Sequence, residues 1–246
     1  MRTDAHIHLL PGMDTGPREA WEAAAMFEAA FEEGVRSFVV TPHYFCDRES
    51  IPEFLLRRRC AFRRLFDAVG QRLYRVLFLA AAEVMLLPGV SALSELSSLV
   101  IPGTDLLPVD FPLSDGISDD VMRELAYIVQ KRHLRPLFCH IERHYDFFSP
   151  EKFEKQLLSF THGAFCISAQ AFPNHELSAA LIRALNNGKQ FFLCSNGHGL
   201  RSRRATLAPR AALSGYSAFA YRKIAKDTDM FFLKLRRQLM PHLTFT

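Results

Sequence analysis

Short apolar runs alternate with longer amphipathic stretches along the whole chain, and no linker-like or low-complexity tract interrupts the alternation. Most of the short runs are apolar at consecutive positions, which is typical of parallel strands covered on both faces. We predict seven strands, at Thr3–Ile7, Ser37–Thr41, Val76–Val84, Leu107–Phe111, Pro136–His140, Ala164–Ala169 and Gln190–Ser195. Strands that alternate with helices predict a single α/β domain, and seven strands is a number typical of a βα barrel.

The stretches between these strands carry the period of an α-helix. In Arg18–Glu33, apolar side chains recur three and four residues apart, and Gly34 follows at the position that commonly ends a helix. The arginine-rich stretch Leu55–Arg64 is interpreted as an exposed helix, with a site for an acidic partner as the alternative. A terminal helix at about 216–240 is expected to pack on the domain, although its continuous apolar face would also suit a membrane surface. Further helices are predicted at Asp119–Lys131, Glu151–Phe160 and Glu176–Asn187.

The composition excludes several classes of protein. Of the 246 residues, 49% are apolar and 23% charged, which is a globular composition rather than a disordered or fibrous one. The 30 basic residues exceed the 26 acidic ones only slightly, so we expect no nucleic-acid partner. No apolar run approaches the roughly 18 residues of a membrane span, and the N-terminus lacks a secretory pattern. The five widely spaced cysteines favour reduced thiols, so we predict a cytoplasmic protein without membrane insertion.

Side chains that can ligate a metal ion fall at the predicted carboxyl ends of the strands. In a βα barrel these ends converge on one face, where active sites are built. His6 and His8 stand two residues apart on a strand and therefore point the same way, so both can bind one ion. The carboxylate of Glu83 can bridge two cations, and closely spaced cations favour displacement at phosphorus. The complete set of candidate ligands is His6, His8, His43, Glu83, Asp110, His140, Asn196 and His198.

Arginines follow two of these candidate ligands. Arg143 comes three residues after His140, and residues 201–204 contain three arginines just beyond the last strand. Because guanidinium groups bind phosphate oxygens in pairs, these positions favour a phosphate substrate. The alternatives are a salt bridge of Arg143 with a neighbouring acidic residue, and simple solvation for two of the three later arginines.

The remaining aromatic residues and histidines have simpler interpretations. Trp21 and the many phenylalanines are expected in the core. For Tyr44 and Phe45, just beyond His43, the alternative is that they line a pocket for an aromatic ring. The histidines outside the strand ends are interpreted as surface residues, namely His133, His144, His162, His175 and His242.

The motifs around the candidate ligands resemble those of the CpsB/CapC family of bacterial protein-tyrosine phosphatases, within the polymerase-and-histidinol-phosphatase (PHP) superfamily. The opening DAHIHLLPGMDTGP, followed by EEGV and VVTPHY, resembles the first two motifs of the family. The later motifs are similar to AAEV, VDFP, CHIERHY and LCSNGHGLRSR, in the same order and spacing. The resemblance covers about residues 1–205.

This resemblance implies a distorted seven-stranded, TIM-like PHP barrel with up to three divalent metal ions, commonly Mn²⁺, with Fe, Co or Zn as alternatives. It implies that a metal-bound hydroxide hydrolyses phosphotyrosine directly, without a cysteine nucleophile. The implied substrate is a bacterial tyrosine kinase with a tyrosine-rich tail that regulates capsule or exopolysaccharide biosynthesis. Arg143 and Arg203 match phosphate-binding positions, and Asp14 matches a residue behind the ligands that supports them or fixes the loop. The metal positions are His6, His8, His43, Glu83, Asp110, His140, Asn196 and His198.

Two of these ligand positions depart from the family pattern. Asp110 stands where the family usually has the longer Glu, and Asn196 stands where it has Asp, so one anionic ligand becomes a neutral amide. Three interpretations remain open: a slower phosphatase, an enzyme adapted to a different metal occupancy, or a catalytically weakened protein that serves as a binding or regulatory partner. Another PHP phosphoesterase, such as a histidinol-phosphatase-like enzyme, is a further alternative. The sequence leaves the oligomeric state open.

Overall fold

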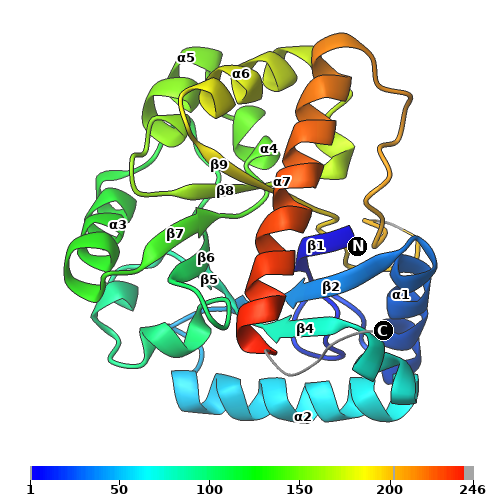
Figure 1. The fold of residues 1–246 in the computed structure, drawn as a ribbon. Coiled ribbons are helices and arrows are strands. Elements are labelled where there is room, and N and C mark those ends of the chain that lie inside the picture. The colour runs from blue at the N-terminus through cyan, green and yellow to red at the C-terminus, as the bar shows by residue number, and fades with distance from the viewer. Residues whose placement is uncertain (1, 202, 241–246) are drawn as a thin grey trace.

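A computed structural model describes residues 2–201 and 203–240, which form an α/β fold with two parallel sheets (Figure 1). The first sheet has the strand order β1-β2-β4, with β1 at Arg2–Ile7, β2 at Val35–Val40 and β4 at Leu77–Ala80. The second has the order β3-β5-β6-β7-β8-β9, and every recorded strand pair is parallel. Its strands are β3 (His43–Tyr44), β5 (Glu83–Met85), β6 (Leu106–Asp110), β7 (Arg135–Phe138), β8 (Ala164–Ser168) and β9 (Gln190–Cys194).

The predicted α/β class is confirmed, but the strands divide differently from the seven that the pattern predicts. The predicted strand Val76–Val84 is wrong as one element, because it breaks into β4 and β5, which belong to different sheets. At the break, Ala81 N donates to Val40 O of the first sheet, whereas Ala82 N donates to Leu99 O. Both halves of this run are buried, so the apolar pattern contains no sign that the pairing partner changes.

Several helices begin at a capping residue that is followed by apolar side chains at helical spacing. The Ser50 side chain accepts from Glu53 N, and Asn174 accepts from Leu177 N. The predicted helix Glu151–Phe160 is wrong in type, because a short helix is followed there by a π-helical stretch at Phe153–Leu158. The helices are α1 (Ala20–Glu32), α2 (Ile51–Val69), α3 (Asp119–Arg132), α4 (Glu142–Tyr145), α5 (Pro150–Lys152), α6 (His175–Asn186) and α7 (Gly215–Leu239). Turns of 3₁₀-helix lie at Gly70–Arg75, Val90–Ala92, Leu96–Leu99 and Ala169–Ala171.

The terminal helix α7 packs on the body of the protein, as predicted. It contacts β1, β9 and α6 and runs across the strands in Figure 1. Phe232 is fully buried and packs edge to face on Phe192 of β9, with the ring centroids 5.7 Å apart. Burying a side chain of this size stabilises the fold by about 2 kcal/mol. In the described part of the chain, no helix is long and apolar enough to cross a membrane.

Other expectations about burial have mixed outcomes. The prediction that Trp21 belongs to the core is wrong, since its side chain is 65% exposed on α1. The arginine-rich helix α2 is largely solvent-facing, as expected, although Arg58 donates to Ala81 O at the break between the sheets.

All five cysteines are free thiols, three of them buried. His242 lies outside the described residues.

Candidate metal centre

Several strand ends and strand starts bring the candidate ligands to one place. His6 lies in β1 and His8 just after it, while Asp110 ends β6 and His140 follows β7. His43 and Glu83 were expected to close strands, but they open the short strands β3 and β5. These strands are parallel neighbours in which His43 is paired with Glu83, so the interrupted strands still deliver both side chains to the centre.

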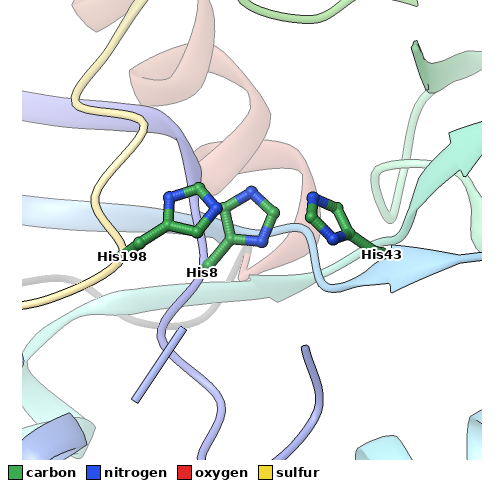
Figure 2. Close-up of side chains that lie close together, drawn as sticks. All are labelled: His8, His43 and His198. Atoms are coloured by element: carbon green, nitrogen blue, oxygen red, sulfur yellow. The ribbon is translucent and has the colours of Figure 1, made fainter. Parts of the chain in front are cut away.

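Two groups of potential ligand atoms result. We call His6, Glu83 and His140 the inner group, and His8, His43 and His198 the outer group; in each, the donor atoms lie within 4.8 Å of one another. All members of the inner group are buried, whereas His43 of the outer group is 24% exposed at its side chain. Figure 2 shows the outer group, with the ring of His8 between those of His198 and His43. The His8 and His198 rings stack with centroids 3.8 Å apart.

Asp14 fixes the outer group from behind. Its Oδ2 lies 2.7 Å from His8 Nδ1 and also accepts from the backbone N–H of His43 at 2.9 Å. Its Oδ1 accepts from Gly16 N, and a Cβ on Gly16 would lie 2.7 Å from the carbonyl oxygen of His8, so the loop passes too close for any larger residue. Burial raises the pKa of Asp14, but the hydrogen bond and charge of His8 outweigh it and hold the pKa well below its usual value.

Two further imidazoles, those of His6 and His198, are oriented through Nδ1 in the same way. Thr41 Oγ1 lies 3.0 Å from Nδ1 of His6, and the backbone oxygen of Asn196 lies 3.0 Å from Nδ1 of His198. Partners at Nδ1 leave Nε2 as the atom turned toward the centre, which is the usual arrangement behind metal-binding histidines. Nε2 of His6 and Nε2 of His8 consequently face each other at 3.0 Å.

Glu83 is the carboxylate on which these nitrogens converge. Its Oε1 lies 2.7 Å from His140 Nε2, and its Oε2 lies 3.1 Å from Nε2 of both His6 and His8. In the described part of the chain, the buried Oε2 makes no hydrogen bond of good geometry. Burial raises the pKa of Glu83, but His140 and His6 outweigh burial and hold it well below its usual range. A carboxylate oxygen among converging imidazole nitrogens is a donor set that fits a divalent cation.

The charges of the centre shift its histidines in opposite directions. Burial lowers the pKa of His6 to about 4. Burial also lowers the pKa of His8, but the nearby carboxylates of Asp14 and Glu83 outweigh burial and raise the pKa to about 9. Protons therefore bind to groups that could otherwise hold a cation, and metal binding to such groups displaces protons.

Asp110 has a partner that the sequence did not reveal. The prediction that His144 is a surface residue is wrong, because it is 1% exposed and its Nε2 lies 3.1 Å from Asp110 Oδ1. The His144 ring stacks on Phe111 with centroids 3.9 Å apart. The second oxygen of Asp110 lies 3.7 Å from His140 Nε2 and 4.0 Å from Arg143 Nη1. The spacing of four residues between two histidines in CHIERHY is the only sequence signal of this arrangement.

Asn196 follows β9 in a tightly constrained turn. Its backbone has φ of 50°, in the left-handed region that asparagine tolerates better than most residues, and its N–H donates to His6 O. The next residue must be glycine, because a Cβ on Gly197 would lie 2.7 Å from Ala205 Cα. The buried Oδ1 of Asn196 has no hydrogen-bond partner among the described residues. Asp4 supports the turn by accepting from both the N–H and the hydroxyl of Ser195.

A cavity of about 890 Å³ opens beside the centre. Asn196 and Ser195 are among its buried lining residues, and Arg143 and Arg203 line it as well. Arg203 Nη1 lies 3.3 Å from His198 Nε2. The other cavity-lining residues include Arg201, Arg204, Arg210, Glu142, Ser168 and Gln170.

The proposed aromatic pocket is only partly compatible with the structure. The prediction that Tyr44 lines a pocket is wrong, because its ring is 1% exposed and packs edge to face on Phe54 in the core. Phe45 is partly exposed and lies beside His43, with ring centroids 5.9 Å apart. Neither ring lines the arginine-rich cavity.

An α/β scaffold of parallel strands that gathers buried histidines and a carboxylate at one site defines a candidate metal-binding α/β protein. The chain belongs to the CpsB/CapC family: the family model described as capsular polysaccharide synthesis, CpsB/CapC, matches residues 2–209. The family resemblance noted from the motifs is thereby confirmed.

Individual relatives agree with this assignment. The tyrosine-protein phosphatase YwqE of Bacillus subtilis is 26% identical over 148 residues, which cover 57% of this chain and 54% of the relative. The chain thus spans about half the length of that curated relative. Crystal structures of YwqE from Bacillus subtilis and CpsB from Streptococcus pneumoniae, described as metal-dependent tyrosine phosphatases, provide a match with a TM-score of 0.67. That match has 18% identity and covers 99% of this chain and 96% of the other, so it shows the same fold.

Proposed function

We propose that this protein is a metal-dependent protein-tyrosine phosphatase, a phosphoric monoester hydrolase. The observation that carries the proposal is the approach of the His6 and His8 nitrogens to one buried oxygen of Glu83, beside a cavity lined by arginines. Positive guanidinium groups next to a metal-binding cluster suit a phosphate ester. Membership of the CpsB/CapC family and the likeness to YwqE point the same way.

The fold proposed for this activity is a distorted seven-stranded PHP barrel. If β2 with β3, and β4 with β5, each count as one interrupted strand, the two sheets together supply seven. The ring would close between β1 and β9, where Ile7 bridges to Gly197 and His8 N donates to Gly197 O. This closure places both ends of the strand order next to the candidate ligands.

The residues proposed to hold metal ions are those of the two groups, with Asp110 and Asn196 beside them. Imidazole and carboxylate donors together suit Mn²⁺, with Fe, Co or Zn as alternatives, and up to three ions are proposed. When bound, such ions act as Lewis acids and activate water for attack at phosphorus.

The chain's own residues would bind and orient the substrate. We assign Arg143 and Arg203 to the phosphate oxygens, because both line the cavity and each approaches a candidate ligand. Asp14 would hold His8 in one orientation through Nδ1. None of the five cysteines lines the cavity, and burial raises the pKa of the Cys166 thiol to about 11, so the proposal needs no thiolate nucleophile.

The substrate proposed is phosphotyrosine on a bacterial tyrosine kinase with a tyrosine-rich tail, which regulates capsule or exopolysaccharide biosynthesis. A cytoplasmic location, where such a tail would be reached, is part of the proposal. Support comes from the family description, which refers to capsular polysaccharide synthesis.

A second candidate function is that of a metal-binding partner protein with weakened catalysis. The observation in its favour is the neutral amide of Asn196, whose Oδ1 has no partner in the described part of the chain. The outer group contains three imidazoles and no carboxylate of its own. A weaker field at this ion would slow hydrolysis without preventing substrate binding.

The test is hydrolysis of a phosphotyrosine peptide with added Mn²⁺, together with bound metal measured by mass spectrometry. The natural chain is compared with His6→Ala, with Asn196→Asp and with His162→Ala, an exposed histidine that serves as the control. Activity that only His6→Ala abolishes supports the phosphatase. Peptide binding without hydrolysis, rescued by Asn196→Asp, supports the partner protein instead. Faster hydrolysis of histidinol phosphate than of the peptide would favour a histidinol-phosphatase-like enzyme and contradict both.

A further inference from the structure

The cavity beside the metal centre is more basic than one phosphate requires. Among the described residues, five arginines line it, at positions 143, 201, 203, 204 and 210, and Glu142 is the one acidic residue in this part of the lining. The carboxylate of Glu142 already has a hydrogen-bond partner, since its Oε2 accepts from Ser168 N at 3.2 Å. A single phosphate ester carries a charge of about −1.5 to −2 at neutral pH. Two arginines are enough to bind it through paired hydrogen bonds.

The five arginines fall into two sets. Arg143 and Arg203 each approach a candidate ligand, at 4.0 Å from Asp110 Oδ2 and 3.3 Å from His198 Nε2. The other three, which we call the basic rim, are exposed residues that line the same cavity. The basic rim consists of Arg201, Arg204 and Arg210, whose side chains make no hydrogen bond or ion pair with the described part of the chain.

The segment that carries most of the basic rim is anchored to the body of the protein. Between Arg204 and Arg210, the side chains of Ala205 and Leu207 are buried. The carbonyl oxygen of Leu207 accepts from the Tyr221 hydroxyl at 2.8 Å, and that of Ala208 accepts from Gln170 Nε2 at 2.7 Å. The segment is therefore held in place, and its charges are presented at a fixed edge of the cavity.

Uncompensated like charges around one cavity repel one another and focus a positive potential into it. A ligand that brings a second negative group would relieve this repulsion. The volume of about 890 Å³ also lies in the upper part of the range for ligand cavities, so there is room for residues next to a phosphotyrosine.

We propose that the basic rim is a specificity site that binds an anionic group, either a carboxylate or a second phosphate, carried by the peptide next to the phosphotyrosine. The inference rests on the proposed function and adds to it the class of sequence that is preferred. Arg204 and Arg210 carry the argument, because they flank the anchored segment. Since the basic rim is exposed, its attraction should act strongly at low ionic strength and weaken as salt is added.

The test uses three peptides of equal length, in which the phosphotyrosine is flanked by alanines, by aspartates, or by a second phosphotyrosine. We expect kcat/KM with Mn²⁺ to be roughly three- to tenfold higher for the aspartate peptide than for the alanine peptide at low salt, and nearly equal at high salt. A gain for both anionic peptides means that a carboxylate suffices. A gain for the second phosphotyrosine alone identifies phosphate as the preferred group.

Variants assign the effect to the basic rim. The double variant Arg204→Gln, Arg210→Gln should lose most of the preference for the aspartate peptide. Arg222→Gln, which removes an exposed charge on α7 outside the cavity lining, should retain it. An alanine peptide hydrolysed as well as both the aspartate peptide and the doubly phosphorylated peptide at low salt would overturn the inference, as would a preference for an anionic peptide that survives in the double variant.

Failure of the proposed function gives a different result. If the alanine peptide and p-nitrophenyl phosphate are both left intact with Mn²⁺ present, the phosphatase proposal fails. The same three peptides then serve as binding probes in calorimetry, and the ratio of their affinities tests the basic rim without any turnover. Equal affinities at low salt would overturn the inference in that case.

Discussion

The two groups of candidate ligands differ in where their negative charge lies. The inner group contains Glu83, whose carboxylate lies directly among the imidazole nitrogens. The outer group has no carboxylate of its own. Asp14 contacts His8 at Nδ1, on the side away from the centre, and the outer group shares Glu83 Oε2 with the inner group, at 3.1 Å from His8 Nε2 and 3.4 Å from His43 Nε2. Because a buried cation needs compensating charge, the inner group should bind metal tightly by itself, whereas the outer group depends on neighbours.

This contrast changes how the amide of Asn196 is understood. The backbone oxygen of Asn196 lies 3.0 Å from Nδ1 of His198, in the group that lacks a carboxylate, and its buried Oδ1 has no partner among the described residues. If Asn196 is a ligand as proposed, its neutral amide would weaken metal binding at the outer group and leave the inner group, which contains Glu83, unaffected. Predictions that alter the charge of either half test the comparison directly.

The largest effect is expected from Glu83→Gln. The amide keeps the shape of the side chain but removes the negative charge among four imidazoles. We therefore expect loss of bound metal and a fall in phosphotyrosine hydrolysis of more than about 100-fold. Metal content by mass spectrometry and kcat/KM measure both effects. Glu95→Gln, at an exposed position, is the matched control. Full metal content in Glu83→Gln would refute the role assigned to the inner group.

Asn196→Asp should act in the opposite direction. A carboxylate at this position adds the charge that the outer group lacks, so its affinity for Mn²⁺ should rise by roughly tenfold or more, and hydrolysis at limiting Mn²⁺ should rise with it. Competition with a metal-binding dye measures the affinity. An unchanged affinity would show that the outer group does not need an anion at this position, and that the contrast between the groups is not one of charge.

Much of this site could be predicted from the sequence because its chemistry lies next to strands. His6, His8 and His140 stand at the ends of apolar runs, and parallel strands bring such ends together whatever the details of pairing. Asp14 was placed behind the ligands by resemblance to the family, and its contact with His8 Nδ1 agrees with that interpretation. Metal roles for all of these residues stay predictions.

Other features were hidden because they depend on tertiary partners. The break between β4 and β5 follows from a change of pairing partner at Ala81 and Ala82, in a run that is apolar throughout. His144 is buried because its ring stacks on Phe111 and its Nε2 contacts Asp110. Neither contact produces a periodic pattern of apolar residues in the sequence. Trp21 was predicted to be buried only because it is large and apolar, but it lies on the exposed face of α1.

Asp14→Asn sharpens the comparison at the outer group. The amide can still contact His8 Nδ1 but loses its charge, so the ring is held less firmly and donates less strongly to an ion. We expect about a tenfold loss of Mn²⁺ affinity and of kcat/KM. Asp67→Asn, an exposed carboxylate on α2, is the control. If Asn196→Asp restores the Mn²⁺ affinity of the Asp14→Asn variant, the carboxylate of Asp14 and a carboxylate at position 196 both act by supplying negative charge near the outer group.

The smallest effect is expected from Thr41→Val, the equivalent change at the inner group. Thr41 Oγ1 contacts His6 Nδ1 at 3.0 Å, and valine keeps the volume of this buried residue while removing the hydroxyl. A neutral hydrogen bond contributes about 1 kcal/mol, less than one to a charged carboxylate, and Glu83 still provides the charge of the inner group. We therefore expect a loss of Mn²⁺ affinity of roughly threefold to fivefold, with Thr161→Val at an exposed position as the control. A loss in Thr41→Val as large as that in Asp14→Asn would mean that orientation of the rings, rather than the placement of charge, distinguishes the two groups.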